Sequence, residues 1–152
     1  MLVIGVLLAV LATRAAPADR IVATVVDVVD GDTIRVQCAG RTEKVRYIGM
    51  DTPETKHPLK GRQPGGAEAA AANRRLVEGK TVRLELDVQQ RDRYRRLLAY
   101  VYVGDVMVNE ELLRLGYAQV MTVPPNVAHA DRFLALEREA REARRGLWGQ
   151  TP

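Results

Sequence analysis

Apolar and polar residues alternate over several short stretches of the chain, which is the pattern of strands that bury one face. These stretches are residues 21–29, 33–38, 42–50, 81–87 and 97–103. Two turn signals, Asp30-Gly31-Asp32 and Ala39-Gly40, separate the first three stretches. We therefore predict an antiparallel meander of three strands, with two more strands later in the chain.

Helical periodicity replaces this alternation in three other stretches. Residues 67–77 are rich in alanine, with Glu68 near the start and Gly79 just past the end, as in a helix that stops at a glycine. Apolar residues also recur at helical spacing in two later stretches: Val108, Leu112 and Leu115 before Gly116, then Phe133, Leu136, Ala140, Ala143 and Leu147. Five short strands with three helices predict an α+β fold, a five-stranded Greek-key β-barrel of the oligonucleotide/oligosaccharide-binding (OB-fold) type.

The first residues form a separate apolar segment. Residues 2–12 carry no charge, and this run is much shorter than the roughly 20 residues that a membrane-crossing helix needs. Ala16-Pro17-Ala18 fits the small-residue pattern of a secretory cleavage site. We predict a signal peptide at residues 1–18, a domain at residues 19–152, a secreted or periplasmic location and no stable membrane anchor. Because no Lys or Arg precedes the run, the alternatives are an upstream start, an uncleaved segment and a buried first element.

Length and composition narrow the class of protein. The 152 residues support one domain, and 47% hydrophobic with 28% charged residues is typical of a folded globular chain. Lys and Arg number 23 against 19 Asp and Glu, a net charge of +4 that is compatible with a polyanionic partner but is weak evidence alone. Cys38 is the only cysteine, which excludes an intramolecular disulfide and a cysteine-rich zinc site.

Carboxylates gather around the first turn and at the start of a long loop. Asp30 and Asp32 flank the turn glycine, while Asp51 and Glu54 open the prolyl loop, residues 51–66, which contains three prolines. Asp32 and Asp51 could share one hard cation with backbone carbonyls and water, and oxygen ligands favour calcium or magnesium over zinc. The alternative is structural, because Asp-Gly is a common turn signal and Asp-Thr-Pro can simply start a loop.

Two arginines complement these acids. Arg46 lies inside the third predicted strand, where an inward-facing guanidinium needs an anionic partner. Arg96 ends the arginine turn, residues 91–96. Two guanidiniums beside a divalent cation would clamp a phosphodiester whose negative charge grows in the transition state. In the alternative interpretation, Arg46 only pairs with a buried carboxylate and Arg96 is solvated.

Three long motifs carry a resemblance to a known family. They are VDGDT at residues 29–33, RYIGMDTPETKHP at 46–58 and DRYRRLLAYV at 92–101, and shorter matches lie at 107–110, 116–118 and 146–148. In order and spacing these motifs resemble the staphylococcal nuclease-like (thermonuclease) family over about residues 21–149. The resemblance implies a five-stranded barrel with three helices and a Ca²⁺-dependent endonuclease or exonuclease that cuts DNA and RNA to products with 3′-phosphates.

The resemblance also implies roles for individual residues. Asp32 and Asp51 match the calcium carboxylates of the family, and Thr52 matches a residue that supplies a backbone carbonyl ligand. Glu54 matches the residue held to be the general base or the positioner of the attacking water. The remaining matches are Arg46 and Arg96, which grip the phosphate, and Asp30, an auxiliary acidic position.

Substrate contacts follow the family less closely. Arg93 and Tyr94 resemble contacts to the terminal phosphate of the nucleotide, and Lys60 on the prolyl loop is a further candidate. Thr122 and Val123 stand where well-known members carry tyrosines that stack on the nucleotide, and Arg95 stands where a glycine is usual. We expect a monomer acting on DNA and RNA, single-stranded or frayed, with no protein partner.

A second function class stays open beside the enzyme. Some domains that resemble this family are non-catalytic modules that bind nucleic acid or protein. Such domains usually lack several catalytic positions, whereas this chain has all of them: Asp32, Arg46, Asp51, Glu54 and Arg96. The sequence therefore favours the enzyme.

Overall fold

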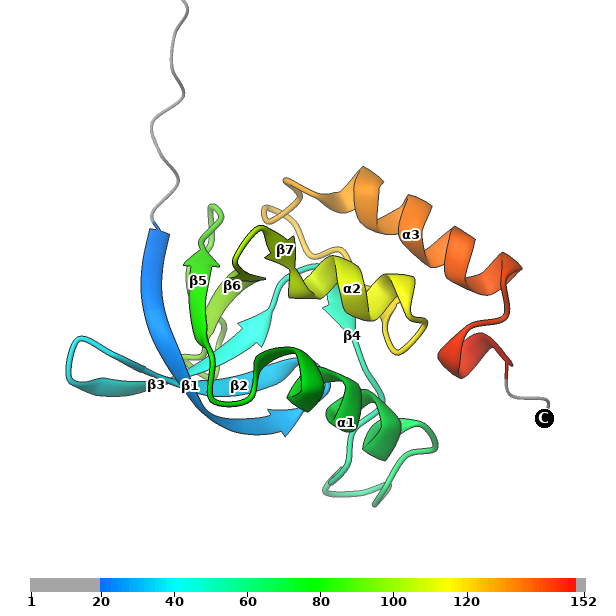
Figure 1. Cartoon of the computed structure of the whole chain (residues 1–152), viewed down its shortest axis with the longest axis horizontal. Coiled ribbons are helices and arrows are strands. Elements are labelled where there is room, and N and C mark those ends of the chain that lie inside the picture. Colours follow the sequence, from blue (N-terminus) through cyan, green and yellow to red (C-terminus); the bar gives the residue numbers. More distant parts are fainter. Residues whose placement is uncertain (1–19, 150–152) are drawn as a thin grey trace, which may run out of the picture.

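Three antiparallel strands begin the fold, in a computed structural model that describes residues 20–149 (Figure 1). They are β1 (Arg20–Asp30), β2 (Thr33–Cys38) and β3 (Arg41–Tyr47). The register pairs Asp30 with Thr33 at one end of the meander and Thr33 with Arg46 across the next pair of strands. The predicted meander is confirmed, and its first turn faces the end of β3.

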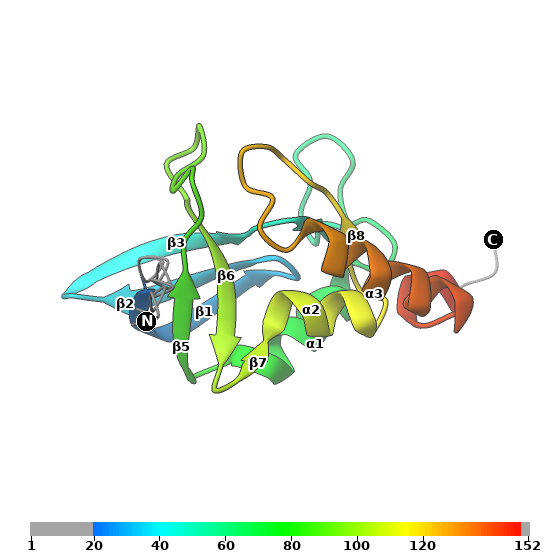
Figure 2. The same cartoon turned by 90° about the horizontal axis from the view of Figure 1, so that it is seen from above.

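Two later strands close the sheet into a barrel. Strand β5 (Thr81–Glu85) pairs with β1, and β6 (Leu97–Val103) pairs antiparallel with β5 and parallel with β3 (Figure 2). The parallel register sets Val45 opposite Leu97 and Arg46 opposite Leu98. A two-residue strand, β7 (Val106–Met107), extends β6. The five-stranded barrel expected from the sequence is therefore present.

The barrel interior is filled by aliphatic side chains from the alternating positions. Ile34, Val36, Val45, Leu84 and Val101 are completely buried. Burial of one such side chain stabilises the fold by about 1.5–3 kcal/mol, so this interior is the main source of stability.

Three helices lie together at one end of the barrel (Figure 1). They are α1 (Gly66–Val77), α2 (Val108–Arg114) and α3 (Ala130–Glu142); α2 packs on α3, and α1 packs on α2 and β1. The predicted extension of the third helix to Leu147 is wrong. The helix ends at Glu142, Arg144 adopts a φ of 52°, and residues Gly146–Gly149 form a separate 3₁₀ turn.

The single strand predicted over residues 42–50 is also wrong, because the chain breaks at Ile48 and Gly49. After this break, β4 (Met50–Asp51) pairs with β8 (Gln119–Val120) in a second sheet of two strands. The break turns the chain away from β3 and brings the Asp51 carboxylate next to the Arg46 guanidinium.

The predicted signal peptide, residues 1–18, lies outside the described residues. Among the helices between residues 20 and 149, none combines the length and the apolar character needed to cross a membrane.

Candidate active site

Asp32 ends the tight turn between β1 and β2 and is 6% exposed. Its Oδ2 accepts hydrogen bonds from the main-chain N–H of Thr52 at 3.0 Å and from the Thr52 hydroxyl at 3.1 Å. The Thr33 hydroxyl donates to Oδ1 at 2.8 Å. Gly31 permits this close packing, since a Cβ there would lie 2.7 Å from Oγ1 of Thr52 and 2.8 Å from Cβ of Ala69. The turn is therefore fixed against both the start of the prolyl loop and α1.

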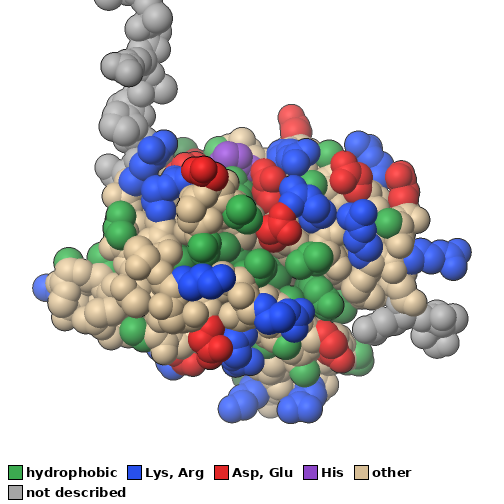
Figure 3. Space-filling view, viewed as in Figure 1, with side chains coloured by type: hydrophobic (Ala, Val, Ile, Leu, Met, Phe, Trp, Pro, Cys, Tyr) green, Lys and Arg blue, Asp and Glu red, His purple; other side chains and the backbone are tan. Residues whose placement is uncertain are grey.

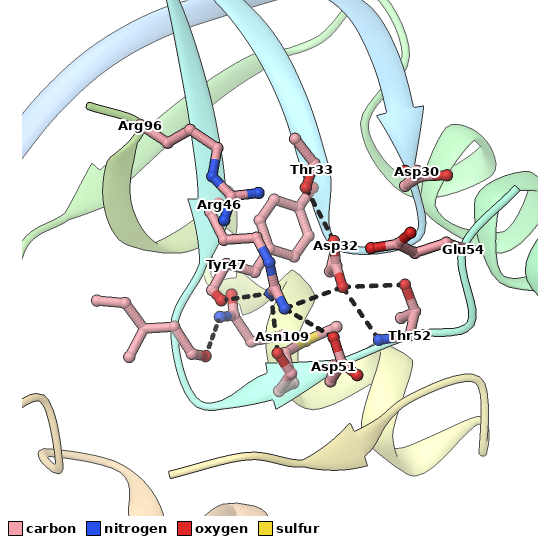
Figure 4. A network of polar contacts seen from close by, with 12 residues as sticks. Asp30, Asp32, Thr33, Arg46, Tyr47, Asp51, Thr52, Glu54, Arg96 and Asn109 are labelled. Atoms are coloured by element: carbon pink, nitrogen blue, oxygen red, sulfur yellow. Dashed lines mark hydrogen bonds and ion pairs between the residues drawn. The ribbon is translucent and has the colours of Figure 1, made fainter. Parts of the chain in front are cut away.

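Arg46 joins β3 to two of the candidate carboxylates (Figure 4). Its Nη2 lies 2.8 Å from Oδ1 of Asp51 and 3.2 Å from Oδ2 of Asp32. Its Nη1 donates to the carbonyls of Tyr47 at 3.0 Å and Met50 at 2.9 Å. A guanidinium buried to 9% exposure needs such partners, because an unpaired buried charge is costly. Arg46 thus has the carboxylate partners expected of an inward-facing strand arginine.

Asp51 faces the cleft more openly than Asp32, with 42% of its side chain exposed. Partial burial raises the pKa of the Asp51 carboxyl above its ordinary value, Arg46 opposes this rise, and the negative charges of Asp32 and Glu54 add to it. The Asp51 carboxylate thus lies close enough to Asp32, Glu54 and Arg46 to feel the charge of each, an arrangement in which a hard cation could bind.

The donor set fits a hard cation that completes its shell with other oxygens. In the described part of the chain, no three His, Cys, Asp or Glu side chains converge closely enough to hold an ion. Calcium nevertheless takes 6–8 oxygen ligands, including main-chain carbonyls and water, so about two carboxylates can suffice. The Asp32 and Asp51 carboxylates with the Thr52 carbonyl match this chemistry, and a soft metal would find no thiolate or imidazole here.

Glu54 and Asp30 lie on the side of Asp32 that faces the prolyl loop. Figure 4 shows the Glu54 carboxylate directed toward Asp32, with Asp30 nearby. Oδ1 of Asp30 accepts hydrogen bonds from the main-chain N–H of Thr55 at 3.1 Å and from the Thr55 hydroxyl at 2.5 Å. Asp30 therefore ties the loop residue that follows Glu54 to the end of β1.

Arg96 is held by the arginine turn through Asp92. Nε of Arg96 donates to Oδ2 of Asp92 at 2.7 Å, and Oδ1 of Asp92 accepts from the main-chain N–H of Arg96 and of Tyr94. Within residues 20–149, the Nη atoms of Arg96 form no hydrogen bond or ion pair with protein, so they can bind an anion. Arg95 adopts a φ of 65°, which explains why a glycine would suit this position.

One cleft of about 840 Å³ brings most of the candidate residues together. It is lined by Asp30, Asp32, Arg46, Asp51, Glu54 and Arg96, and by the basic residues Arg35, Lys44, Lys56 and Arg74. Thr52 is buried behind Asp32. Lys60, Arg93 and Tyr94 are exposed and are not among the lining residues; Arg93 donates to the Tyr94 hydroxyl at 2.6 Å. The expected substrate contacts thus lie outside this cleft.

A smaller pocket of about 190 Å³ adjoins the cleft. Arg46 and Arg96 line both hollows, and Leu98, Met121 and Val123 give the smaller pocket apolar walls. Of the two positions at which well-known family members carry tyrosines, Val123 therefore lines this pocket. Thr122 is not among its lining residues.

Sequence reasoning missed two buried asparagines that support the site. Asn73 on α1 accepts from the Tyr47 hydroxyl at 2.8 Å and donates to the main-chain carbonyl of Asp30 at 2.9 Å. Asn109 on α2 accepts from the N–H of Val101 at 2.9 Å and donates to the carbonyl of Ile48 at 3.0 Å. Each is fully buried, and the signal available was an amide on the apolar face of a predicted helix.

The surface shows how the charges are distributed. In the view of Figure 3, Lys and Arg side chains alternate with Asp and Glu over the helical end, and no large surface of one sign appears.

Comparison with known proteins agrees with this geometry. The family model described as staphylococcal nuclease homologue matches residues 44–150. A thermonuclease of Staphylococcus hyicus is 40% identical over 124 residues, covering 82% of this chain and 73% of the relative. Endonuclease YncB of Bacillus subtilis is 43% identical over 81% of this chain, and the SPbeta prophage-derived endonuclease YokF of the same species is 44% identical over 80%.

The relatives differ in how much of their length is matched. This chain spans 59% of YncB and 42% of YokF, whereas it spans about three quarters of the thermonuclease. The family-model match contains Arg46, Asp51, Glu54 and Arg96, whereas Asp32 and strands β1 and β2 precede it. On the family model, the identities and the closed barrel with its three helices, the chain belongs to the staphylococcal nuclease family.

Proposed function

We propose that this protein is a calcium-dependent nuclease that hydrolyses phosphodiester bonds of DNA and RNA, from ends and internally, and leaves 3′-phosphates. The observation that carries the proposal is the convergence of Asp32, Asp51, Glu54, Arg46 and Arg96 on one cleft. Relatives named thermonuclease and endonuclease support it.

The carboxylate side of the cleft would hold the cation. Asp32, Asp51 and the Thr52 carbonyl are its ligands in this proposal, and Arg46 keeps both carboxylates oriented through its Nη2. When bound, calcium neutralises phosphate charge and orients a water. Because the pKa of Asp51 is raised, this carboxylate is protonated at a higher pH than an ordinary aspartate. Protonation removes one ligand, so cation binding should weaken at that higher pH as the solution is acidified.

The opposite side of the cleft would bind the phosphate. The Nη atoms of Arg96 would donate to the phosphate oxygens while Asp92 holds Nε. The attraction between the guanidinium and the phosphate would grow as the phosphorus becomes five-coordinate, because negative charge then builds up on the oxygens. Glu54 accepts a proton from the attacking water, which adds to phosphorus as the P–O5′ bond breaks. The 5′ oxygen leaves with a proton from solvent, and the phosphate stays on the 3′ oxygen.

The smaller pocket would receive the base next to the cut. Its apolar walls include Leu98, Met121 and Val123, and Tyr47 is the one aromatic residue among its lining residues. Arg93, Tyr94 and Lys60, which lie outside the cleft, would contact phosphates further along the strand. A base can enter this pocket only when it is unpaired, so we propose a preference for single-stranded or frayed ends.

Three cleavage reactions test the proposal. The purified chain is incubated with heat-denatured DNA or RNA in calcium, in magnesium and in chelator, and the product ends are analysed for 3′-phosphates. We expect cutting of both substrates in calcium alone. Cutting that persists in chelator would overturn the metal mechanism, and binding without cutting would favour the non-catalytic module.

Asp51→Asn is the control that tests whether calcium binds at Asp51. Calcium at 100 times its dissociation constant should stabilise the wild type by about 2.7 kcal/mol, measured as a shift in thermal unfolding. The variant should fold but lose that shift, because the amide removes a charged ligand. An equal shift in both proteins would place calcium elsewhere.

A further inference from the structure

Glu54 is held only through its main chain. In the described residues its carboxylate has no hydrogen bond or ion pair, and Figure 4 draws no contact to it. The other acids of the cleft differ, because Asp30, Asp32 and Asp51 each bond through their side chains. The bond from which the Glu54 side chain extends, Cα–Cβ, therefore takes its direction from the contacts that fix the Glu54 backbone.

Gln63, at the far end of the prolyl loop, bonds both polar groups of that backbone. The main-chain N–H of Glu54 donates to Oε1 of Gln63 at 2.8 Å, and the main-chain N–H of Gln63 donates to the Glu54 carbonyl at 3.0 Å. The two bonds close the loop on itself across nine residues. The two peptide groups that flank the Glu54 Cα are each bonded, so neither can rotate without breaking a bond, and the Cα–Cβ direction of Glu54 is set.

Two neighbouring contacts make the arrangement more rigid. The start of α1 lies against Glu54, since a Cβ on Gly66 would lie 2.7 Å from the Glu54 carbonyl oxygen. Asp30 holds the next residue, Thr55, from the other side. Of these anchors, Gln63 alone bonds Glu54 itself through a side chain.

We infer that Gln63 is a positioning residue for the nuclease reaction. Its side-chain oxygen fixes the Glu54 main chain, so that the carboxylate meets the attacking water without touching any protein partner. This role rests on the proposed function. Because Gln63 does not line the cleft, its removal should change the rate of the chemical step and leave substrate binding unchanged.

The test compares substitutions that differ in one acceptor oxygen. Gln63→Met keeps the length and removes the acceptor, whereas Gln63→Glu keeps an oxygen at the same reach. We expect Gln63→Met to lower kcat by about 10- to 100-fold with KM unchanged, the loss typical of a small misplacement, and Gln63→Glu to restore most of it. Gln37→Met is the control, because that glutamine also accepts one hydrogen bond, from Thr42 on the β2–β3 hairpin.

A double-mutant cycle with Glu54→Gln separates positioning from general loop damage. If Gln63 acts through Glu54, Gln63→Met should cost little more in the Glu54→Gln background. An equal loss in both backgrounds would overturn the inference, as would a Gln63→Met variant with wild-type kcat. If Gln63→Met fails to fold, Gln63→Ala takes its place in the same cycle. In whichever variant folds, the rate of hydrogen exchange at the Glu54 amide must rise, because that amide has lost its acceptor.

The two hypotheses fail in different ways. A wild type without calcium-dependent cutting overturns the proposed function together with this role. An active wild type that is sensitive to Glu54→Gln but insensitive to Gln63→Met overturns the role of Gln63 alone.

Discussion

Arg46 and Arg96 line the same cleft, but the protein holds them differently. Arg46 is buried on β3 and bonds two carboxylates and two main-chain carbonyls. Arg96 is partly exposed, and its guanidinium is held by a single acid, Asp92, four residues away along the chain. One arginine is part of the fold, and the other is presented to whatever enters the cleft.

This difference extends to the two sides of the cleft. The strand side, formed by the β1–β2 turn, β3 and β4, is a connected network of buried polar groups whose energies depend on one another. The loop side, formed by the arginine turn and, at the adjoining pocket, residues 121–126, is more exposed, and it is tied to the barrel mainly by Arg91, which bonds Glu43 on β3. We therefore expect changes on the strand side to affect stability and activity together, and changes on the loop side to affect activity alone.

Arg46→Met should have the largest effect. It leaves the Asp32 carboxylate buried without its cation and frees the carbonyls of Tyr47 and Met50. Breaking a buried ion pair costs about 3–5 kcal/mol, which urea unfolding would measure. Nuclease activity should be lost as well. A variant with wild-type stability would show that the strand side is no more integrated than the loop side.

Arg96→Met is the contrasting change on the loop side. Removing one donor to a developing oxyanion typically lowers kcat by about 10²–10³-fold, and loss of the partly exposed pair with Asp92 should cost only about 1 kcal/mol. Arg141→Met removes a comparable i,i+4 pair, with Glu137 on α3, and should retain activity. Parental cleavage rates in Arg96→Met would rule out Arg96 as the transition-state clamp.

The same contrast explains which parts of the fold could be predicted. Alternation revealed the barrel strands because each buries one face in a common core. It could not show the break at Ile48 and Gly49, since β4 is stabilised by β8, which lies almost seventy residues further along the chain. The helical spacing that includes Leu147 was misleading, because this side chain packs against Gly65 at the start of α1 after a change of direction.

The site shows the same limit. That the carboxylates and arginines share one cleft was predictable from the family motifs that contain them, because these motifs are long and keep their order and spacing. Asn73 and Gln63 were not, because each acts on the main chain of a residue brought close only by folding: Asn73 bonds Asp30 across 43 positions. An amide on the apolar face of a helix marks Asn73 as a buried polar group, but the sequence does not identify the backbone that it bonds.

Val123→Tyr should add a substrate contact on the loop side. Val123 is 56% exposed and lines the smaller pocket, so a ring there can stack on a bound base. Stacking contributes about 1–3 kcal/mol per base, which should appear as a lower KM for single-stranded DNA with kcat and stability unchanged. Val127→Tyr is the matched control, since Val127 is 48% exposed and is not among the pocket residues. An equal effect of both variants would mean that the pocket does not hold the base.

Arg95→Gly should have the smallest effect. It changes the cost of the left-handed backbone conformation at one position of the arginine turn. Arg95 is exposed and adopts a φ of 65°, a conformation that costs a residue with a Cβ about 1–2 kcal/mol and costs glycine much less. Glycine also loses more entropy on folding, so we expect a net stabilisation of at most about 1 kcal/mol by urea unfolding. Arg95→Ala keeps the Cβ and removes only the charge, so it should not stabilise. If both variants stabilise equally, repulsion among the arginines of the turn is the cause. If Arg95→Gly also changes kcat, the backbone of the turn and the Arg96 side chain are coupled.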